Sequence, residues 1–380
     1  MTRSTLAIGY MIQEYEPFWF RAAWWFKLYP DGATSDRHNF SPLLLASIHG
    51  LAPAVKVLLK EGDGSLELRD RYGRTALGWA AALGYYDVAK LLIDGPGGML
   101  KRLGRLSFWR GADIESRDDI GATPLIWATM GGAESIARLL VHKGADIEAK
   151  DGDGMTALLV ASRSRGETAI AGFLLDMGAN IEAKDDSGRT PLLRAVGSAT
   201  VLLLLQKGAN TEAKNDFGRT ALMLAADTGR QDIAALLIEN KAMLEAKDKL
   251  SRTALSIACF NGDLNMARFL LQKGADVDTK DGFAQSPLSS ACNRRNEAVI
   301  KLLLESHADI ELRCRHGLTP LSHVWQSERV SRNPYPSPTF YLKTVPTWRE
   351  ETVMAGRYFH NMLSWAIAAR CGGFSITEPI

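Results

Sequence analysis

The fold is decided by a 33-residue stretch that recurs along the chain, and at residues 118–150 it reads DDIGATPLIWATMGGAESIARLLVHKGADIEAK. It opens with the frame Asp-x-x-Gly-x-Thr-Pro/Ala-Leu, which returns at intervals that are mostly 33 or 34 residues. The leading position of the frame falls at Asp36, Asp70, Asp118, Asp151, Asp185, Asn215, Asp248, Asp281 and Cys314. A fixed period of this length indicates a stack of small units that share one core, here about nine of them.

Each unit is expected to form two helices. The Thr of the frame can cap a helix N-terminus, and a Pro after it costs no hydrogen bond at the first helical position. These residues are Thr75, Thr123, Thr156, Thr190, Thr220 and Thr253, with Pro124, Pro191, Pro287 and Pro320. The second helix carries a Leu-rich pair and is expected to end in the left-handed conformation at the Gly of Gly-Ala-Asp/Asn. These glycines are Gly111, Gly144, Gly178, Gly208 and Gly274.

The repeated unit resembles the ankyrin repeat, and the resemblance covers roughly residues 36–326. It implies an all-α solenoid with short β-hairpin fingers, in which fingers and first helices line a concave protein-binding groove. Four positions depart from the pattern: Lys241 and His307 replace the Gly after the second helix, while Ser251 and Ala284 replace the turn Gly. A non-Gly residue there costs on the order of 1 kcal/mol, so we expect an irregular and less stable array.

The ends of the array are expected to be covered, because an open repeat exposes its apolar face. Residues 1–35 are rich in aromatic side chains and are interpreted as an N-terminal cap or arm, with an interfacial membrane segment as the alternative. Residues 327–346 form a Pro-rich linker, and residues 347–380 a C-terminal capping helix and tail, or a helix offered to a partner. An insert at 95–109 is expected to be a surface loop, with a basic docking element as the alternative.

The composition excludes several classes of protein. A net charge of +2 in 380 residues gives no general attraction to nucleic acid. No apolar stretch is long enough for a transmembrane helix, and the N-terminus lacks a cleavage site, so an intracellular protein of the cytoplasm or nucleus is expected. Cys259 and Cys292 occupy the same place in adjacent repeats, too far apart for a disulfide.

Catalytic chemistry is not expected from this sequence. Asp151 and Asp153 look faintly like a calcium loop, but the remaining ligands are missing. Cys314, His316 and His323 have no standard metal-site spacing. We therefore predict no metal, no cofactor and no enzymatic activity; a hidden enzyme is a remote alternative.

Aligned repeats also give two charged columns, one acidic and one basic, two residues apart. The acidic column is Glu67, Glu115, Glu148, Glu182, Glu212, Glu245, Asp278 and Glu311. The basic column is Arg69, Arg117, Lys150, Lys184, Lys214, Lys247, Lys280 and Arg313. We interpret them as parallel ladders that neutralise each other across neighbouring fingers.

The finger tips differ between repeats, and such variation is what specific recognition requires. Candidate protein-binding residues are Tyr72, Arg74, Ile120, Met155, Arg189, Phe217, Arg219, Leu250, Arg252, Phe283 and His316. Exposed aromatic side chains and arginines in one row are typical of binding hot spots. The sequence thus predicts a monomeric scaffold or adaptor that binds one or more proteins; a membrane-associated protein tethered by residues 1–35 is the alternative.

Overall fold

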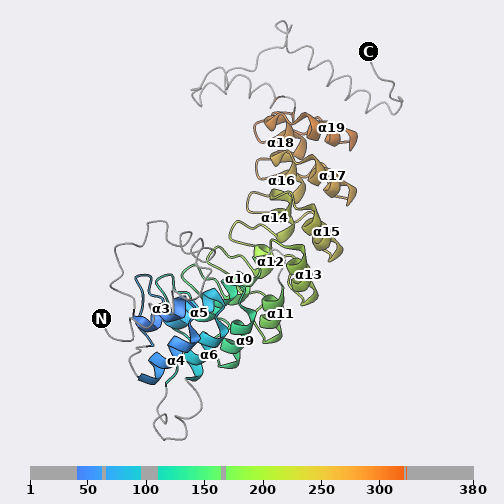
Figure 1. Cartoon of the computed structure of the whole chain (residues 1–380). Helices are drawn as coiled ribbons and strands as arrows, with labels where there is room; N and C mark the ends of the chain where they lie inside the picture. Colours follow the sequence, from blue (N-terminus) through green and yellow to red (C-terminus); the bar gives the residue numbers. More distant parts are fainter. Residues whose placement is uncertain (1–40, 62–65, 96–109, 164–167, 321, 323–380) are drawn as a thin grey trace, which may run out of the picture. The chain divides into compact units, whose positions relative to one another are not determined.

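The computed structural model describes residues 41–61, 66–95, 110–163, 168–320 and 322 (Figure 1). The chain divides into two compact units, Met1–Ala209 (unit 1) and Asn210–Ile380 (unit 2). The predictions for residues 1–35, for 96–109 of the insert, for the linker 327–346 and for the C-terminal helix 347–380 lie outside the described residues.

The described residues of unit 1 form five pairs of short helices. The pairs are α3 (Pro42–Ile48) and α4 (Ala52–Glu61), α5 (Ala76–Leu83) and α6 (Tyr86–Asp94), α8 (Pro124–Met130) and α9 (Glu134–His142), α10 (Ala157–Ala161) and α11 (Ala169–Asp176), and α12 (Pro191–Arg194) and α13 (Ser198–Gln206). First helices contact neighbouring first helices, as α5 contacts α8, and second helices contact second helices, as α6 contacts α9. This is the regular side-by-side stacking that the sequence period predicts.

The described residues of unit 2 form three pairs of the same kind. They are α14 (Ala221–Asp227) and α15 (Gln231–Glu239), α16 (Ala254–Asn261) and α17 (Leu264–Gln272), and α18 (Pro287–Arg294) and α19 (Glu297–Glu305). The fingers extend from the side of α14, α16 and α18, away from α15, α17 and α19 (Figure 1). Another frame starts at Cys314 and is described only as far as its first helical residues, so the count of nine repeats stays a prediction.

The first helices begin at hydroxyl caps, as the frame predicts. Gly78 N–H, for example, donates to Thr75 Oγ1 over 3.3 Å. The same bond is made by Ser41, Thr123, Thr156, Thr253 and Ser286. Thr190 and Thr220 are exceptions, because no cap bond forms at either and both hydroxyls are buried without a hydrogen-bond partner. α12, which follows Thr190, has only four residues.

The second helices end as expected at left-handed glycines, where Gly144, Gly178, Gly208 and Gly274 have φ between 87° and 93°. After Gly144, Ala145 N–H donates to Leu140 O over 3.0 Å and closes the helix end. Ala112 makes the equivalent bond to Leu92 O over 2.9 Å, so the helix end keeps its geometry across the insert. Gly111 itself does not have positive φ; it is required because a Cβ there would lie 2.2 Å from Ile93 O.

The four predicted departures from glycine do adopt positive φ. Lys241 and His307 have φ of 67° and 62°, and Ser251 and Ala284 have φ of 56° and 57°. A fifth non-glycine residue with positive φ was not predicted. It is Arg295, at φ 56°, which ends α18 where Gly84 and Gly262 end α5 and α16. All five lie in unit 2.

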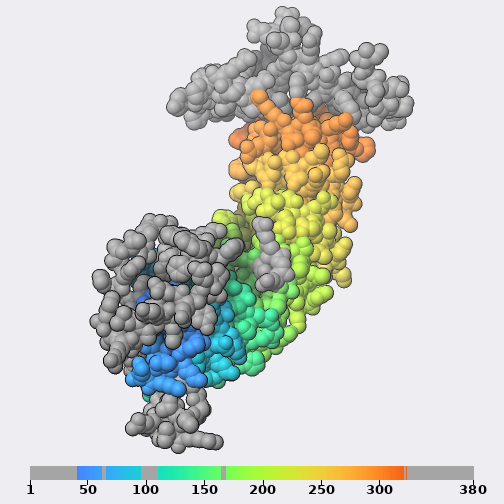
Figure 2. Space-filling view, in the orientation of Figure 1, coloured from blue at the N-terminus to red at the C-terminus, as the bar shows by residue number. Residues whose placement is uncertain are grey.

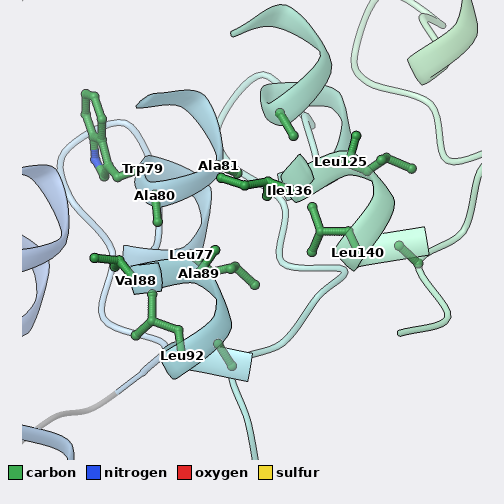
Figure 3. Close-up of a cluster of buried hydrophobic side chains, with 14 of the residues drawn as sticks. Leu77, Trp79, Ala80, Ala81, Val88, Ala89, Leu92, Leu125, Ile136 and Leu140 are labelled. Carbon is green, nitrogen blue, oxygen red and sulfur yellow. The ribbon is translucent and has the colours of Figure 1, made fainter. Parts of the chain in front are cut away.

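The hydrophobic core extends from each helix pair into the next, so no pair has a separate core of its own. In unit 1, Leu77 and Leu92 of one repeat gather with Leu125, Ile136 and Leu140 of the next (Figure 3). Because these side chains come from four helices of two repeats, neither repeat can bury its apolar surface alone. The described residues contain no β strand, so the predicted β-hairpin fingers are turns held by isolated hydrogen bonds.

Candidate protein-binding surface

Each finger tip is a turn fixed by the leading residue of the frame. In the repeat of Asp118, the carboxylate Oδ1 accepts Ile120 N–H over 3.1 Å and Ala122 N–H over 2.9 Å. Asp118 N–H donates in turn to Ala122 O over 3.2 Å. The same arrangement is present at Asp70, Asp151, Asp185, Asn215, Asp248 and Asp281. The tips are therefore ordered before any partner arrives.

Neighbouring tips are joined by one backbone hydrogen bond each. In unit 1, Asp119 N–H donates to Tyr72 O over 3.0 Å, and Gly152 N–H donates to Ile120 O over 2.8 Å. In unit 2, the bonds are Lys249 to Phe217 (3.0 Å), Gly282 to Leu250 (2.7 Å) and Arg315 to Phe283 (3.0 Å). In each of these bonds the acceptor is the carbonyl of the third residue of the frame. The bond between tips therefore uses the backbone of this residue and not its side chain.

The side chains at this third position are exposed, as the sequence analysis predicts for most of them. The exposed fractions are 52% for Ile120, 62% for Phe217, 48% for Leu250 and 52% for Phe283. His316 at the same position is also exposed, whereas Tyr72 is half-buried beneath Arg71 and Arg74. An apolar side chain held in water on an ordered backbone is available for a partner.

The fifth position of the frame is different, and Met155 must be removed from the candidate surface. Its side chain is 4% exposed and packs with Leu159 and Ala183. The reason is local: this residue directly precedes the helix cap, so its side chain lies over the first helix and not at the tip.

Four predicted arginines share this fifth position and are half-buried. The Arg74 guanidinium lies 4.8 Å from the ring of Trp79 and 4.1 Å from the ring of Trp127, with Nε 3.5 Å from Asp118 Oδ2. Arg252 binds Asp248 Oδ2 through Nε and Nη2, over 3.0 and 2.8 Å.

The other two arginines at this position are Arg189 and Arg219. Arg219 Nη1 pairs with Asp227 over 2.9 Å, and both arginines keep a buried Nε without a hydrogen bond. Arginines at this position therefore work mainly within the fold, through cation–π contacts and charge-assisted hydrogen bonds.

The tenth position of the frame was missed by the sequence analysis. Trp79 Nε1 donates to Asp70 Oδ2 over 2.9 Å, and Trp127 Nε1 donates to Asp118 Oδ2 over the same distance. Figure 3 shows Trp79 pointing away from the leucines that form the repeat core. The signal was present in the sequence, because both Trp side chains lie nine residues after the leading Asp.

Arg194 occupies the tenth position in the repeat of Asp185 and donates from Nε to Asp185 Oδ2 over 2.6 Å. Burial by itself raises the pKa of Asp185. Hydrogen bonds from the Arg189 N–H, the Arg194 guanidinium and the Ser187 N–H, with the charge of Arg194, lower this pKa by more. The net pKa lies below the ordinary value of an Asp, so the carboxylate is stabilised in its charged form.

The acidic column binds the backbone of the following repeat, which corrects the interpretation that its main role is to neutralise the basic column. Glu67 Oε1 accepts the N–H of Asp113, and Glu115 Oε1 accepts the N–H of Asp146, over 2.9 and 2.8 Å. Glu148, Glu212, Glu245 and Asp278 make the same bond to the following repeat. Each of these six acids therefore holds the backbone where the next finger begins.

The basic column binds the backbone close to the tips. Lys150 Nζ donates to Lys184 O and Lys214 Nζ to Lys247 O, both over 2.8 Å. Arg117 Nη1 donates to Lys150 O and also to Gly121 O in its own turn. These cations bind neutral carbonyls, so their positive charge is not cancelled by the contact.

The described residues hold no group of three His, Cys, Asp or Glu side chains that could bind a metal ion. Cys259, Cys292 and Cys314 are free and buried, as predicted for the first two, and burial raises the pKa of the Cys259 and Cys292 thiols to about 12. None of the described helices is long and apolar enough to cross a bilayer.

Comparison with known families gives a match. The family model described as "Ankyrin repeats (3 copies)" matches residues 26–101, 96–185 and 192–281, which is more than half of the chain. The protein therefore belongs to the ankyrin-repeat family, whose repeats are generally modules for protein–protein interaction. A comparison with curated proteins finds no match.

Proposed function

We propose that this protein is a non-enzymatic scaffold or adaptor that captures partner proteins with its finger tips and first helices, on the concave side typical of ankyrin arrays. The proposal includes a ninth repeat starting at Cys314 and a cap at each end of the array. One observation carries it: Ile120, Phe217, Leu250 and Phe283 expose about half of their apolar surface at one equivalent position.

The backbone beneath these side chains supports the proposal. Each tip is closed by its own Asp or Asn and hydrogen-bonded to its neighbour, so little conformational entropy remains to be lost when a partner binds. Aromatic side chains on a rigid support are typical of the residues that dominate interface energies. The free cysteines fit a reducing compartment, and we place the protein in the cytoplasm or nucleus, as a monomer.

The test is affinity capture from cell extract followed by mass spectrometry, with a variant that carries Phe217→Ser, Leu250→Ser and Phe283→Ser. We expect this variant to lose specific partners while its thermal midpoint and helical circular dichroism stay nearly unchanged, because the three side chains are exposed. A matched control carries Val57→Ser, Met177→Ser and Leu202→Ser, which remove exposed apolar side chains on or just after second helices.

The control is expected to retain the partners. Equal partner loss in both variants would show that general surface hydrophobicity, and not the finger tips, is responsible. A large loss of helicity in the first variant would place these side chains in the core and contradict the proposal.

A further inference from the structure

The finger tips of unit 2 form an unbroken apolar row, whereas those of unit 1 do not. Phe217, Leu250 and Phe283 occupy the third position of three consecutive frames, and their carbonyls are joined to the next tip by hydrogen bonds of 2.7–3.0 Å. In unit 1 the row is interrupted by Asp153 and Ser187. Unit 2 thus presents three apolar side chains in fixed register, one for each finger; the fingers appear at the left edge of its yellow-to-orange part in Figure 2.

The spacing of this row determines the shape of a complementary ligand. Stacked repeats place equivalent residues about 8–10 Å apart. An extended peptide advances about 3.3 Å per residue and a polyproline II helix about 3.1 Å, so every third residue of either recurs after about 9–10 Å. An α-helix that docks through its apolar stripe uses anchors at i, i+3, i+4 and i+7, about twice as dense as the tips. The row therefore matches an extended chain.

The charge of the tips determines the sign of the charge on a complementary ligand. From the residue before the frame to its fifth residue, the four frames of unit 2 hold eight Lys or Arg and three Asp, whereas the four described frames of unit 1 hold seven of each sign. Two of the three acids, Asp248 and Asp281, have Oδ1 occupied by the N–H groups of their own turn. Arg219 and Arg252 are paired with Asp227 and Asp248, and without these ions the unit 2 frames still hold six Lys or Arg and two Asp. The unit 2 tips are therefore positive, and the unit 1 tips are balanced.

The cations also lie at the right places along the row. Lys214, Lys247, Lys280 and Arg313 are exposed, one for each finger. The Lys214 ammonium binds Lys247 O on the next finger and so lies between two neighbouring fingers. A ligand that follows the row thus meets apolar side chains and positive charges with the same period.

We propose that the fingers of unit 2 bind an extended acidic peptide segment with an apolar side chain at every third position. This inference rests on the proposed function and specifies the chemistry of its partner. The apolar side chains of the segment pack against Phe217, Leu250 and Phe283, and its carboxylates face the basic column. The attraction between these exposed charges is screened by salt.

The test measures binding of fluorescent peptides to the full-length protein by anisotropy. The first probe repeats Phe-Glu-Pro three times, and the second replaces each Glu by Lys to reverse the charge. The third has the composition of the first but places its Phe residues at every second position, which changes the spacing. The fourth is a helical acidic peptide with an apolar residue at every seventh position. We expect the first probe to bind at least about tenfold more tightly than the others and to weaken with added salt.

Variants assign this binding to unit 2. The variant with Phe217→Ser, Leu250→Ser and Phe283→Ser is expected to weaken the first probe by more than about tenfold, because burial of one such side chain supports roughly that factor. Lys247→Glu is expected to weaken it several-fold and to flatten the salt dependence. The matched control carries Val57→Ser, Met177→Ser and Leu202→Ser, on or just after second helices of unit 1, and is expected to leave binding unchanged.

Several outcomes would overturn the inference: tighter binding of the Lys or helical probe, or binding insensitive to the unit 2 variants. If partner capture depends on the tips but the first probe does not bind, the proposed function stands and the acidic, period-three ligand is wrong. If neither capture nor probe depends on the tips, both proposals fail.

Discussion

The two units are built from the same repeat, but they differ in backbone strain and in the surface chemistry of their finger tips. Among the described residues of unit 1, every left-handed backbone position is a glycine, and the finger tips carry equal numbers of positive and negative residues. Unit 2 places five non-glycine residues at positive φ and carries a positive, apolar row of tips. The frame fixes helices and core in both units, so the difference lies at positions where the frame permits substitution.

Substitutions in the core should lower the free energy of unfolding most, and by similar amounts in the two units. Leu140 and Leu270 occupy equivalent places in their repeats and are fully buried. Replacing either by Ala should lower the free energy of unfolding by about 2–5 kcal/mol, since the cavity adds to the lost burial. Urea denaturation followed by circular dichroism measures this. A much smaller loss at one site would contradict the view that both units share one packing scheme.

The buried carboxyl of Asp185 in unit 1 and the half-buried carboxyl of Asp278 in unit 2 should have pKa shifts of opposite sign. The pKa of Asp185 in unit 1 is lowered, so its contribution to stability is fully present above the ordinary Asp value near 3.8 and is lost as pH falls through the lower folded pKa. In unit 2, burial raises the pKa of Asp278, and the nearby charges of Asp309 and Asp276 raise it further. A hydrogen bond from Asp309 N–H and the charge of Lys280 lower this pKa by less, so the net pKa is raised. Its contribution is present below pH 3.8 and is lost as pH rises through the raised pKa.

Substitution by Asn tests this contrast. Asp185→Asn should destabilise the protein by roughly 1–3 kcal/mol at neutral pH, because charge-assisted hydrogen bonds are lost. Asp278→Asn keeps an oxygen that can accept the Asp309 N–H and removes an unfavourable charge, so it should be neutral or slightly stabilising. Urea midpoints measured between pH 3 and pH 7 give both effects. Destabilisation of equal size by the two variants would refute the assignment.

The smallest effect concerns the backbone. Lys241 has φ 67° at the place where Gly144 has φ 92°. Lys241→Gly should stabilise the protein by roughly 0.5–1 kcal/mol, because relief of left-handed strain exceeds the entropy gained by the unfolded chain. Gly144→Ala should destabilise it by a similar amount through strain alone, since nothing lies within 4 Å of the added Cβ. Calorimetry resolves both shifts, and a destabilising Lys241→Gly would show that this site is not strained.

The sequence predicted the parts of the fold that depend on local chemistry and on the period. Thr75 caps its helix, Gly144 ends one, and Lys241 adopts positive φ, because backbone geometry alone demands these outcomes. The exposure of Phe217 followed from its place at the end of a turn. These features repeat, so one correct inference applies to many repeats.

Side-chain reach across repeats could not be predicted in the same way. Met155 and Asp153 both follow the same Asp, but only a three-dimensional turn shows that Met155 folds back on the helix. The acidic and basic columns are two residues apart, which suggested mutual pairing, whereas each binds the backbone of the next repeat. Arg295 was not predicted, although it stands at the repeat position of Gly84 and Gly262 and could have been found by the comparison that identified Lys241.

The buried thiols of Cys259 and Cys292 can report how often two repeats of unit 2 open. With a pKa near 12, each is almost wholly in the unreactive S–H form at neutral pH, because only the thiolate attacks an alkylating or disulfide reagent. Modification must then await an opening of α16 or α18, on which the two residues lie. The rate at which each thiol is consumed would report how often its own repeat opens.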